Sequence, residues 1–156
     1  MTKIIQTNIH FNQNIDKIFH IADIHIENET DRHSEYKKVF KNLYDTIKKN
    51  KTKTSIIIIC GDIIDKSNRI SPDCIKLTKE FLGSLSKILP TIVISGNHDD
   101  NIRGNATKTD SLSAIISDSN FSNIHHFRDT AVYQVGKNIS FGLTSVFDEK
   151  LIKASD

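Results

Sequence analysis

Apolar residues in the first two thirds of the chain gather in short continuous runs, and longer segments of mixed character separate these runs. The runs lie in residues 17–23, 54–62 and 91–99, and each of them stops at polar or acidic residues. Continuous apolarity, as opposed to strict alternation, is typical of parallel β-strands that are covered on both faces. The pattern therefore predicts three parallel strands, and we expect all three to be central strands of one sheet.

The two segments between these runs have the periodicity of amphipathic helices. The apolar stripe of residues 34–50 consists of Tyr36, Val39, Phe40, Leu43 and Ile47. Residues 71–89 begin with Ser71 as the predicted N-cap and Pro72 at the first helical position. The stripe of this second helix consists of Ile75, Thr78, Phe81, Leu82, Leu85 and Ile88. Two successive βαβ units predict a parallel sheet with right-handed crossovers.

The pattern changes in the last third of the chain. Residues 123–127, 131–135 and 138–146 are short, closely spaced segments of strand character. We expect them to form either an antiparallel continuation of the sheet or the beginning of a second sheet. Residues 3–11 predict an additional edge strand. The chain is thus predicted to have an α/β fold, organised as a single domain over residues 1–156.

The composition is that of a soluble globular domain, because 37% of the 156 residues are hydrophobic and 26% are charged. The net charge of +2 is too small to indicate a nucleic-acid-binding protein, although acidic residues elsewhere can balance a basic groove. The longest apolar run, residues 56–60, is too short to span a bilayer, and the start of the chain lacks the apolar core of a secretion signal. We therefore expect no membrane association and no secretion.

The two cysteines, Cys60 and Cys74, do not have the number or spacing of a disulfide framework. Cys60 ends an apolar run, and there we predict a small buried side chain. Both features favour a reducing compartment, so we expect an intracellular protein, cytoplasmic or nuclear.

Polar side chains with metal-binding character follow all three predicted parallel strands. Ligands of an α/β sheet bind beyond the carboxyl ends of its strands, so these side chains are expected to meet at one edge. Asp23 and His25 are alternate residues, and alternate residues of an extended segment point to the same side. The pairs, in chain order, are Asp23 and His25, Asp62 and Asp65, and Asn97 and His98.

Carboxylate, imidazole and amide groups together suit a divalent ion such as manganese, magnesium, iron or zinc. Gly61 and Gly96 precede two of the pairs and allow the backbone to approach closely and leave the strand sharply. A Gly-Asn-His-Asp segment is by itself also an ordinary turn. Three such pairs at one sheet edge favour a metal site over three unrelated turns.

Three short segments resemble the first signature blocks of the calcineurin-like metallophosphoesterases. They are "DIH" at residues 23–25, "GDIID" at 61–65 and "GNHD" at 96–99. More narrowly, residues 17–147 resemble the nuclease subunit of SbcD type, which acts in DNA double-strand-break repair. The resemblance implies a β-sandwich flanked by helices (αββα). Its parallel βαβαβ first half would be followed by short antiparallel strands and would be incomplete at the C-terminus.

The resemblance also implies roles for the residues of these blocks. Asp23 and His25 would ligate the first metal ion, Asp62 would bridge two ions, and Asn97 would ligate the second. His98 would face the scissile phosphate as a catalytic residue without binding metal. The implied cofactors are two divalent ions, with Mn²⁺ expected first and Mg²⁺, Fe²⁺ and Zn²⁺ as alternatives.

Three further residues near the blocks have less specific expectations. By resemblance, Asp99 would not bind metal itself but would hold the imidazole of His98 in place. Asp65 either supports the site in a similar way or caps a local turn. Arg103 follows the third block, where the family places basic contacts to phosphate or DNA, and an ordinary surface arginine is the alternative.

The chain departs from the family pattern in its later histidines. The family completes its site with three more histidines, two of them spaced by one residue, whereas only His125 and His126 follow His98 here. Adjacent residues of a strand point to opposite faces, so these two cannot replace such a pair. We expect the amino-terminal portion of a longer nuclease, with a naturally shortened relative as the alternative. The chain alone is then expected to hold no ion or one weakly bound ion.

His10, His20, His125 and His126 are predicted to be structural, with His20 either in the core or behind the metal ligands. The implied activity is a metal-dependent phosphodiesterase or nuclease that acts on DNA ends, with an SbcC-type coiled-coil ATPase as partner. Alternatives are a generic phosphoesterase acting on a nucleotide or phosphoprotein, and a catalytically incomplete scaffold. We also expect uncovered apolar surface near residues 131–142, which would favour a homo-oligomer.

Overall fold

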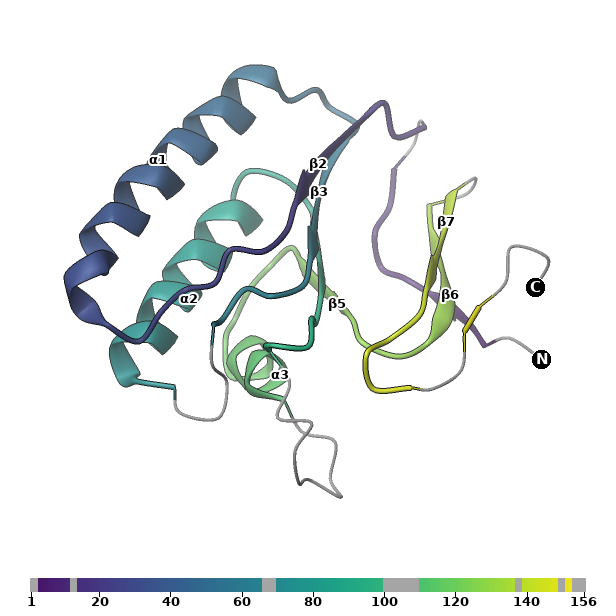
Figure 1. Cartoon of the computed structure of the whole chain (residues 1–156). Helices are drawn as coiled ribbons and strands as arrows, with labels where there is room; N and C mark the ends of the chain where they lie inside the picture. The colour runs from purple at the N-terminus through teal and green to yellow at the C-terminus, as the bar shows by residue number, and fades with distance from the viewer. Residues whose placement is uncertain are drawn as a thin grey trace.

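Two β-sheets pack face to face, and helices cover the outer face of the larger sheet (Figure 1). The computed structural model describes residues 3–11, 14–65, 70–99, 110–136, 139–148 and 151–152. Within these residues the α/β class is confirmed.

The larger sheet has four strands, all parallel, in the order β2-β3-β4-β5. The strands are β2 (Lys17–Ile21), β3 (Ser55–Cys60), β4 (Thr91–Ile94) and β5 (Ile124–Phe127). The three parallel strands expected from the continuous apolar runs are therefore present. Their carboxyl ends all lie at the same edge of the sheet.

Helices α1 (His33–Asn50) and α2 (Pro72–Ser86) connect these strands, and a short 3-10 helix, η1 (Thr30–Arg32), precedes α1. The N-cap of α2 is confirmed, because the Cys74 N–H donates to the Ser71 hydroxyl over 3.1 Å. In the described residues, none of the helices combines the length and the apolarity that crossing a membrane requires.

The smaller sheet has the order β1-β6-β7. Its strands are β1 (Ile4–Gln6), β6 (Ala131–Val135) and β7 (Ile139–Leu143). β1 runs parallel to β6, whereas β6 and β7 form an antiparallel pair. The predicted N-terminal edge strand and the predicted second sheet are both present.

β3 lies between two hydrophobic clusters, which explains its uninterrupted apolar sequence. Ile57 and Ile59 pack with the helices, whereas Ile56 and Ile58 pack against the smaller sheet. All four side chains are buried. Alternate residues point to opposite faces, so a strand covered on both sides needs apolar residues at every position.

The expectation of antiparallel pairing was wrong for residues 124–127. β5 runs parallel to β4 and belongs to the larger sheet. A helix that the apolar periodicity did not reveal, α3 (Ser111–Ser117), lies between β4 and β5 in the chain. A connection through a helix returns the chain to the same edge of the sheet, and the pairing is then parallel.

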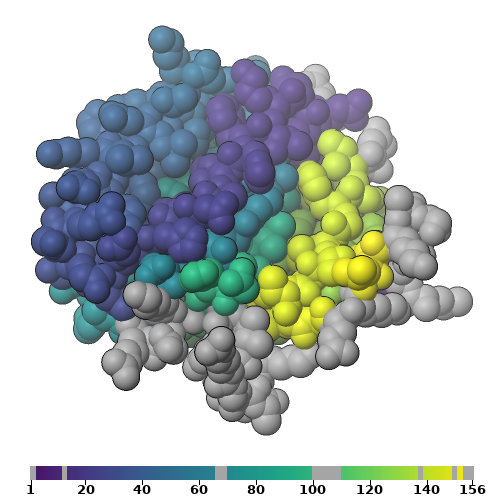
Figure 2. Space-filling model, viewed as in Figure 1, coloured from purple at the N-terminus to yellow at the C-terminus, as the bar shows by residue number. Residues whose placement is uncertain are grey.

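The expectation that β2 is a central strand was also wrong for the described residues, where it pairs only with β3. Figure 2 shows β2 and the segment after it at the surface, between α1 and the smaller sheet. His20, expected in the interior, is exposed, as is His10. Cys60, also expected to be buried, is exposed at the end of β3.

The apolar residues of β6 and β7 are buried or half-buried, contrary to our expectation of uncovered apolar surface. Ala131, Tyr133 and Val135 are buried against the larger sheet, and the Tyr133 ring stacks on Phe127 at 4.0 Å between ring centroids. Helices contribute to the other cluster only, so in the described residues the second helical layer of an αββα sandwich is not present. Packing between the two sheets therefore buries the inward-facing residues of β6.

Candidate metal centre

Backbone hydrogen bonds join the segment after β2 to the segment after β3. The Asp23 N–H donates to the Gly61 carbonyl over 3.3 Å, and the N–H groups of Ile24 and His25 both donate to the Asp62 carbonyl over 2.9 Å. A parallel bridge between Ile26 and Ile64 continues this contact beyond the sheet. The first two blocks therefore lie side by side.

Asp23, His25 and Asp62 have left-handed backbone conformations, with φ of 54°, 48° and 53°. This conformation costs about 1–2 kcal/mol for a residue with a side chain. Such strain is concentrated at functional sites, where the surrounding structure maintains it. The three side chains gather at one point, because their candidate ligand atoms all lie within 4.8 Å of one another.

Two carboxylates lie beside the His25 ring. Its Nδ1 lies 3.5 Å from Asp65 Oδ1, and its Nε2 lies 3.9 Å from Asp23 Oδ1. A proton on Nδ1 directed at Asp65 leaves the Nε2 lone pair beside a second electron-rich atom. A carboxylate behind a histidine commonly fixes the ligating nitrogen in this way. This donor set fits a divalent cation between His25 and Asp23.

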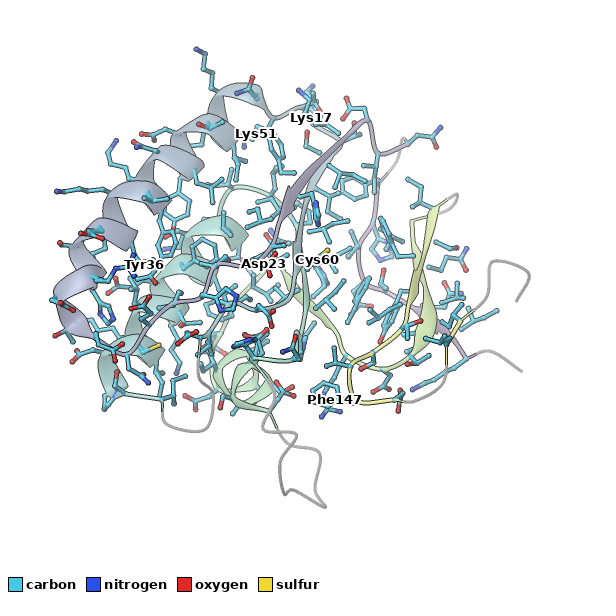
Figure 3. The ribbon with its side chains drawn as sticks, in the orientation of Figure 1. Lys17, Asp23, Tyr36, Lys51, Cys60 and Phe147 are labelled. Carbon is cyan, nitrogen blue, oxygen red and sulfur yellow. The ribbon has the colours of Figure 1, made fainter. Side chains whose placement is uncertain are left out.

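Helix α1 also holds His25, through the side chain of Tyr36. The Tyr36 hydroxyl donates to the His25 carbonyl oxygen over 2.6 Å. Figure 3 shows Tyr36 on α1. It also shows Asp23 just after the carboxyl end of β2, whereas Lys17 lies at the beginning of that strand. The side chain of Asp23 is 75% exposed and that of His25 is 34% exposed, so the centre is open to solvent.

Two glycines bring the third block against the second. A Cβ atom on Gly96 would lie 2.2 Å from Asp62 Oδ1, and one on Gly61 would lie 2.7 Å from the Gly96 Cα. Gly61 also has a φ of 82°, which favours glycine. Both positions thus exclude a side chain, and the predicted close approach at these glycines is present.

Asp99 is fully buried, and it ties the third block to the second through the backbone. Its Oδ1 accepts the N–H groups of Ile63 and Ile64, and its Oδ2 accepts that of Gly96, each over 2.9 Å. Burial raises the pKa of the Asp99 carboxyl to about 6, although these hydrogen bonds act in the opposite direction. The expectation that Asp99 holds the His98 imidazole was therefore wrong, because backbone amides are its partners.

His98 is held by the second block. Its N–H donates to Asp62 Oδ1 over 2.9 Å, and its Nδ1 donates to the Asp65 carbonyl oxygen over 2.7 Å. The bond to this carbonyl raises the pKa of His98. The ring meets that of His25 edge-on, with 4.7 Å between centroids. Nε2 is the ring nitrogen that remains for a phosphate oxygen.

The structure brings the predicted residues of all three blocks to one sheet edge. Asn97 lies between Gly96 and His98 on the turn that contacts Asp62, and it is exposed. Asp65 Oδ1 lies 3.5 Å from His25 Nδ1, which agrees with the supporting role, and the alternative of a cap on a local turn stays a prediction. Arg103 lies outside the described residues. The assignments of individual ligands stay predictions.

Two contributing residues were missed by sequence reasoning. Tyr36 was assigned only to an apolar stripe, although a tyrosine there also carries a hydroxyl that needs a partner when it is partly buried. His126 was classed as structural, yet its Nε2 lies 3.0 Å from the Ser95 hydroxyl, immediately before the third block.

Comparison with known proteins agrees with this geometry. Residues 16–149 match the family described as calcineurin-like phosphoesterase. The chain is also similar to the uncharacterized protein R555 of Acanthamoeba polyphaga mimivirus, with 40% identity over 139 residues. That alignment covers 88% of this chain and 10% of the viral protein, so the chain spans about a tenth of the length of this relative.

Proposed function

Because the chain belongs to the calcineurin-like phosphoesterase family, we propose that it carries the metal centre of a phosphodiesterase that acts on DNA ends in double-strand-break repair or recombination. The observation that supports hydrolysis most directly is the convergence of Asp23, His25 and Asp62 within 4.8 Å at the carboxyl edge of a parallel sheet. The family supports a metal-dependent phosphoester hydrolase. The choice of DNA rests on the resemblance of the sequence to SbcD-type nucleases.

In the longer protein the proposed site would bind two divalent ions, with Mn²⁺ preferred. Asp23 and His25 would hold the first ion and Asn97 the second, and Asp62 would be shared between them. Divalent ions supply the Lewis acidity that activates water and neutralises the charge of a phosphodiester. The two carboxylates and the imidazole of this set are the donors that such ions require.

His98 is the proposed catalytic residue of the chain itself. Its bond to the Asp65 carbonyl keeps the proton on Nδ1 and directs Nε2 away from the protein backbone. The same bond raises the pKa of His98, which favours the imidazolium form. An imidazolium can donate from Nε2 to a phosphate oxygen and orient the ester, or protonate the leaving oxygen.

The test is a cleavage assay on linear and circular DNA with Mn²⁺, in which the chain is compared with a longer form of the protein. DNA with ends should be degraded, and the same protein carrying Asp62→Asn should be inactive. Degradation that does not depend on a divalent metal would contradict the proposal.

A second substrate in the same assay distinguishes a generic phosphoesterase from a nuclease. Equal hydrolysis of bis(p-nitrophenyl) phosphate together with intact DNA would favour a nucleotide or phosphoprotein substrate. A folded protein that binds neither Mn²⁺ nor DNA in any form would favour the incomplete scaffold.

An SbcC-type coiled-coil ATPase is the proposed partner, and it too rests on the resemblance. Co-purification of such a subunit with the longer protein would support the assignment. A homo-oligomer is the further proposal for the chain itself. Light scattering that gives the mass of one chain at all concentrations would contradict that part.

A further inference from the structure

A buried polar cluster lies directly behind the third block. We call it the His126 cluster, and its members are Ser95, Asp110, Ser113 and His126. Ser95 follows β4, His126 lies on β5, and the other two lie at the start of α3. Figure 1 shows α3 next to β5 below the strands. Ser95 is 4% exposed and Asp110 is 3% exposed, whereas Ser113 and His126 are half-buried, so the two ends of the cluster are shielded from water.

The hydrogen bonds of the cluster have one consistent direction. The Ser113 hydroxyl donates to Asp110 Oδ2, so its oxygen is left to accept from His126 Nδ1, which lies 3.5 Å away. With the proton on Nδ1, Nε2 is an acceptor, and the Ser95 hydroxyl donates to it over 3.0 Å. Burial lowers the pKa of His126, which agrees with a neutral ring.

Asp110 fixes one end of this series of hydrogen bonds. It accepts the Ser113 N–H as the N-cap of α3, and it accepts a hydrogen bond from Arg128 Nε over 3.0 Å. A buried carboxylate with these partners keeps one position. The cluster is therefore fixed at Asp110 and ends at Ser95.

Ser95 is the last residue before the turn that carries Asn97 and His98. Gly96 has no side chain with which to anchor this turn, and the space for one is filled by Asp62. Side chains on its two sides hold the turn instead. Asp99 binds the Gly96 amide from one side, and Ser95 is bound by His126 from the other.

We propose that His126 is a positioning residue of the candidate metal centre, which holds the turn of Asn97 and His98 in place through its hydrogen bond with Ser95. The inference rests on the proposed function, because it assigns a role toward the same site. His126 touches neither substrate nor metal in this role. It sets the position of the residues that do.

Three variants isolate the hydrogen bond from the packing of the ring. His126→Leu removes the acceptor, whereas His126→Gln puts an amide group where Nε2 lies and can accept from Ser95 again. His125→Leu is the matched control, because His125 is half-buried on the same strand and adjacent strand residues face opposite sides.

The first measurement is amide hydrogen exchange of the metal-free proteins. The N–H groups of Gly96 and His98 are bonded to Asp99 and Asp62, so their exchange reports how firmly the turn is held. His126→Leu should speed the exchange of both amides about tenfold or more relative to Ile57 in β3, and His126→Gln should restore it. His125→Leu should leave the ratio unchanged.

The second measurement is the affinity for Mn²⁺ by electron paramagnetic resonance. Loss of a residue that orients ligands typically lowers metal affinity about 10–100-fold, and we expect the lower end for His126→Leu. Ser95→Ala should add little to His126→Leu, because both variants remove the same bond.

Unchanged exchange at Gly96 and His98 in a folded His126→Leu protein would overturn the inference, even if the melting temperature falls. A His126→Gln protein that behaves like His126→Leu would overturn it as well, since the acceptor would then not be the cause. Failure of the longer protein to bind Mn²⁺ would contradict the proposed function alone, because the exchange ratio decides the role of His126 without metal.

Discussion

The two junctions of the candidate metal centre are held together in different ways. The junction between the β2 and β3 segments consists of backbone hydrogen bonds, such as those from Ile24 and His25 to the Asp62 carbonyl. The junction between the β3 and β4 segments depends on side chains, because the carboxylates of Asp99 and Asp62 accept the backbone amides. Backbone contacts persist through most substitutions, whereas the second junction can be changed one side chain at a time.

This difference divides the site into a rigid half and an adjustable half. Asp23 and His25 belong to the half whose position any sequence with the same backbone would keep. Asn97 and His98 belong to the half that depends on Asp99, on the two glycines and on the His126 cluster. Substitutions in the second junction should therefore displace the phosphate-facing side of the centre and leave the first ligand pair in place.

Asp62→Asn should have the largest effect, because Asp62 belongs to both junctions. Its backbone carbonyl joins the β2 segment and its carboxylate joins His98. The amide retains an oxygen for the His98 N–H but loses the negative charge between the ions. We expect the affinity for Mn²⁺ to fall at least about a hundredfold, since ligands contribute more than the residues that orient them.

Calorimetry with Mn²⁺ measures this loss, and the circular dichroism melting curve should show that Asp62→Asn leaves the fold intact. Asp73→Asn, on the exposed first turn of α2, is the matched control and should bind metal normally. Retention of wild-type affinity by the Asp62→Asn protein would mean that the bridge has been assigned to the wrong residue.

Gly96→Ala should have the next largest effect, and it should be confined to the second junction. Its Cβ would fall on Asp62, so the turn must move away. Overpacking of this kind costs about 3 kcal/mol of unfolding free energy. Gly142→Ala is the control, because its Cβ would meet Ile152 at an ordinary contact distance of 3.8 Å. Urea unfolding compares the two, and equal stability would show that the close approach is less tight than described.

Asp99→Asn should have an intermediate effect. An amide oxygen can still accept from Ile63 and Ile64, but the amide nitrogen would then face the Gly96 N–H as a second donor. An unsatisfied buried donor costs about 2 kcal/mol. Asp118→Asn, at an exposed pair with Lys79, should change the unfolding free energy by less than about 1 kcal/mol. If both variants unfold at the same urea concentration, Asp99 does not hold the turn.

The sequence was sufficient to predict which residues meet, because local patterns determine the positions concerned. Continuous apolar runs indicate strands covered on both faces, and parallel strands end at one edge. Asp23, Asp62 and His98 therefore had to lie near one another once three parallel strands were inferred. Gly61 and Gly96 were correctly expected at a close approach, because their position at the strand exits leaves few other reasons for a glycine.

The partners that hold these residues were not predictable in the same way. Asp99 was assigned to the imidazole next to it in the sequence, whereas its partners are amides of the β3 segment, 35 and 36 residues away. The contact of Ser95 with His126 spans 31 residues and depends on β5 lying beside β4. That pairing depends in turn on α3, whose seven residues are too few for a clear helical period.

Tyr36→Phe tests the rigid half and should have the smallest effect. The variant removes the hydroxyl that donates to the His25 carbonyl over 2.6 Å and keeps the aromatic ring. The loss of one such bond costs about 1 kcal/mol. Because the His25 and Ile24 amides keep their bonds to Asp62, the His25 ring should hardly move, and the affinity for Mn²⁺ should fall by less than about fivefold.

Tyr44→Phe is the matched control on the same helix, since its hydroxyl makes a longer contact of 3.5 Å with the Phe81 carbonyl, away from the centre. A drop in metal affinity for Tyr36→Phe as large as that for Asp99→Asn would show that the backbone bonds alone do not hold the first junction, and the division into a rigid and an adjustable half would then be wrong.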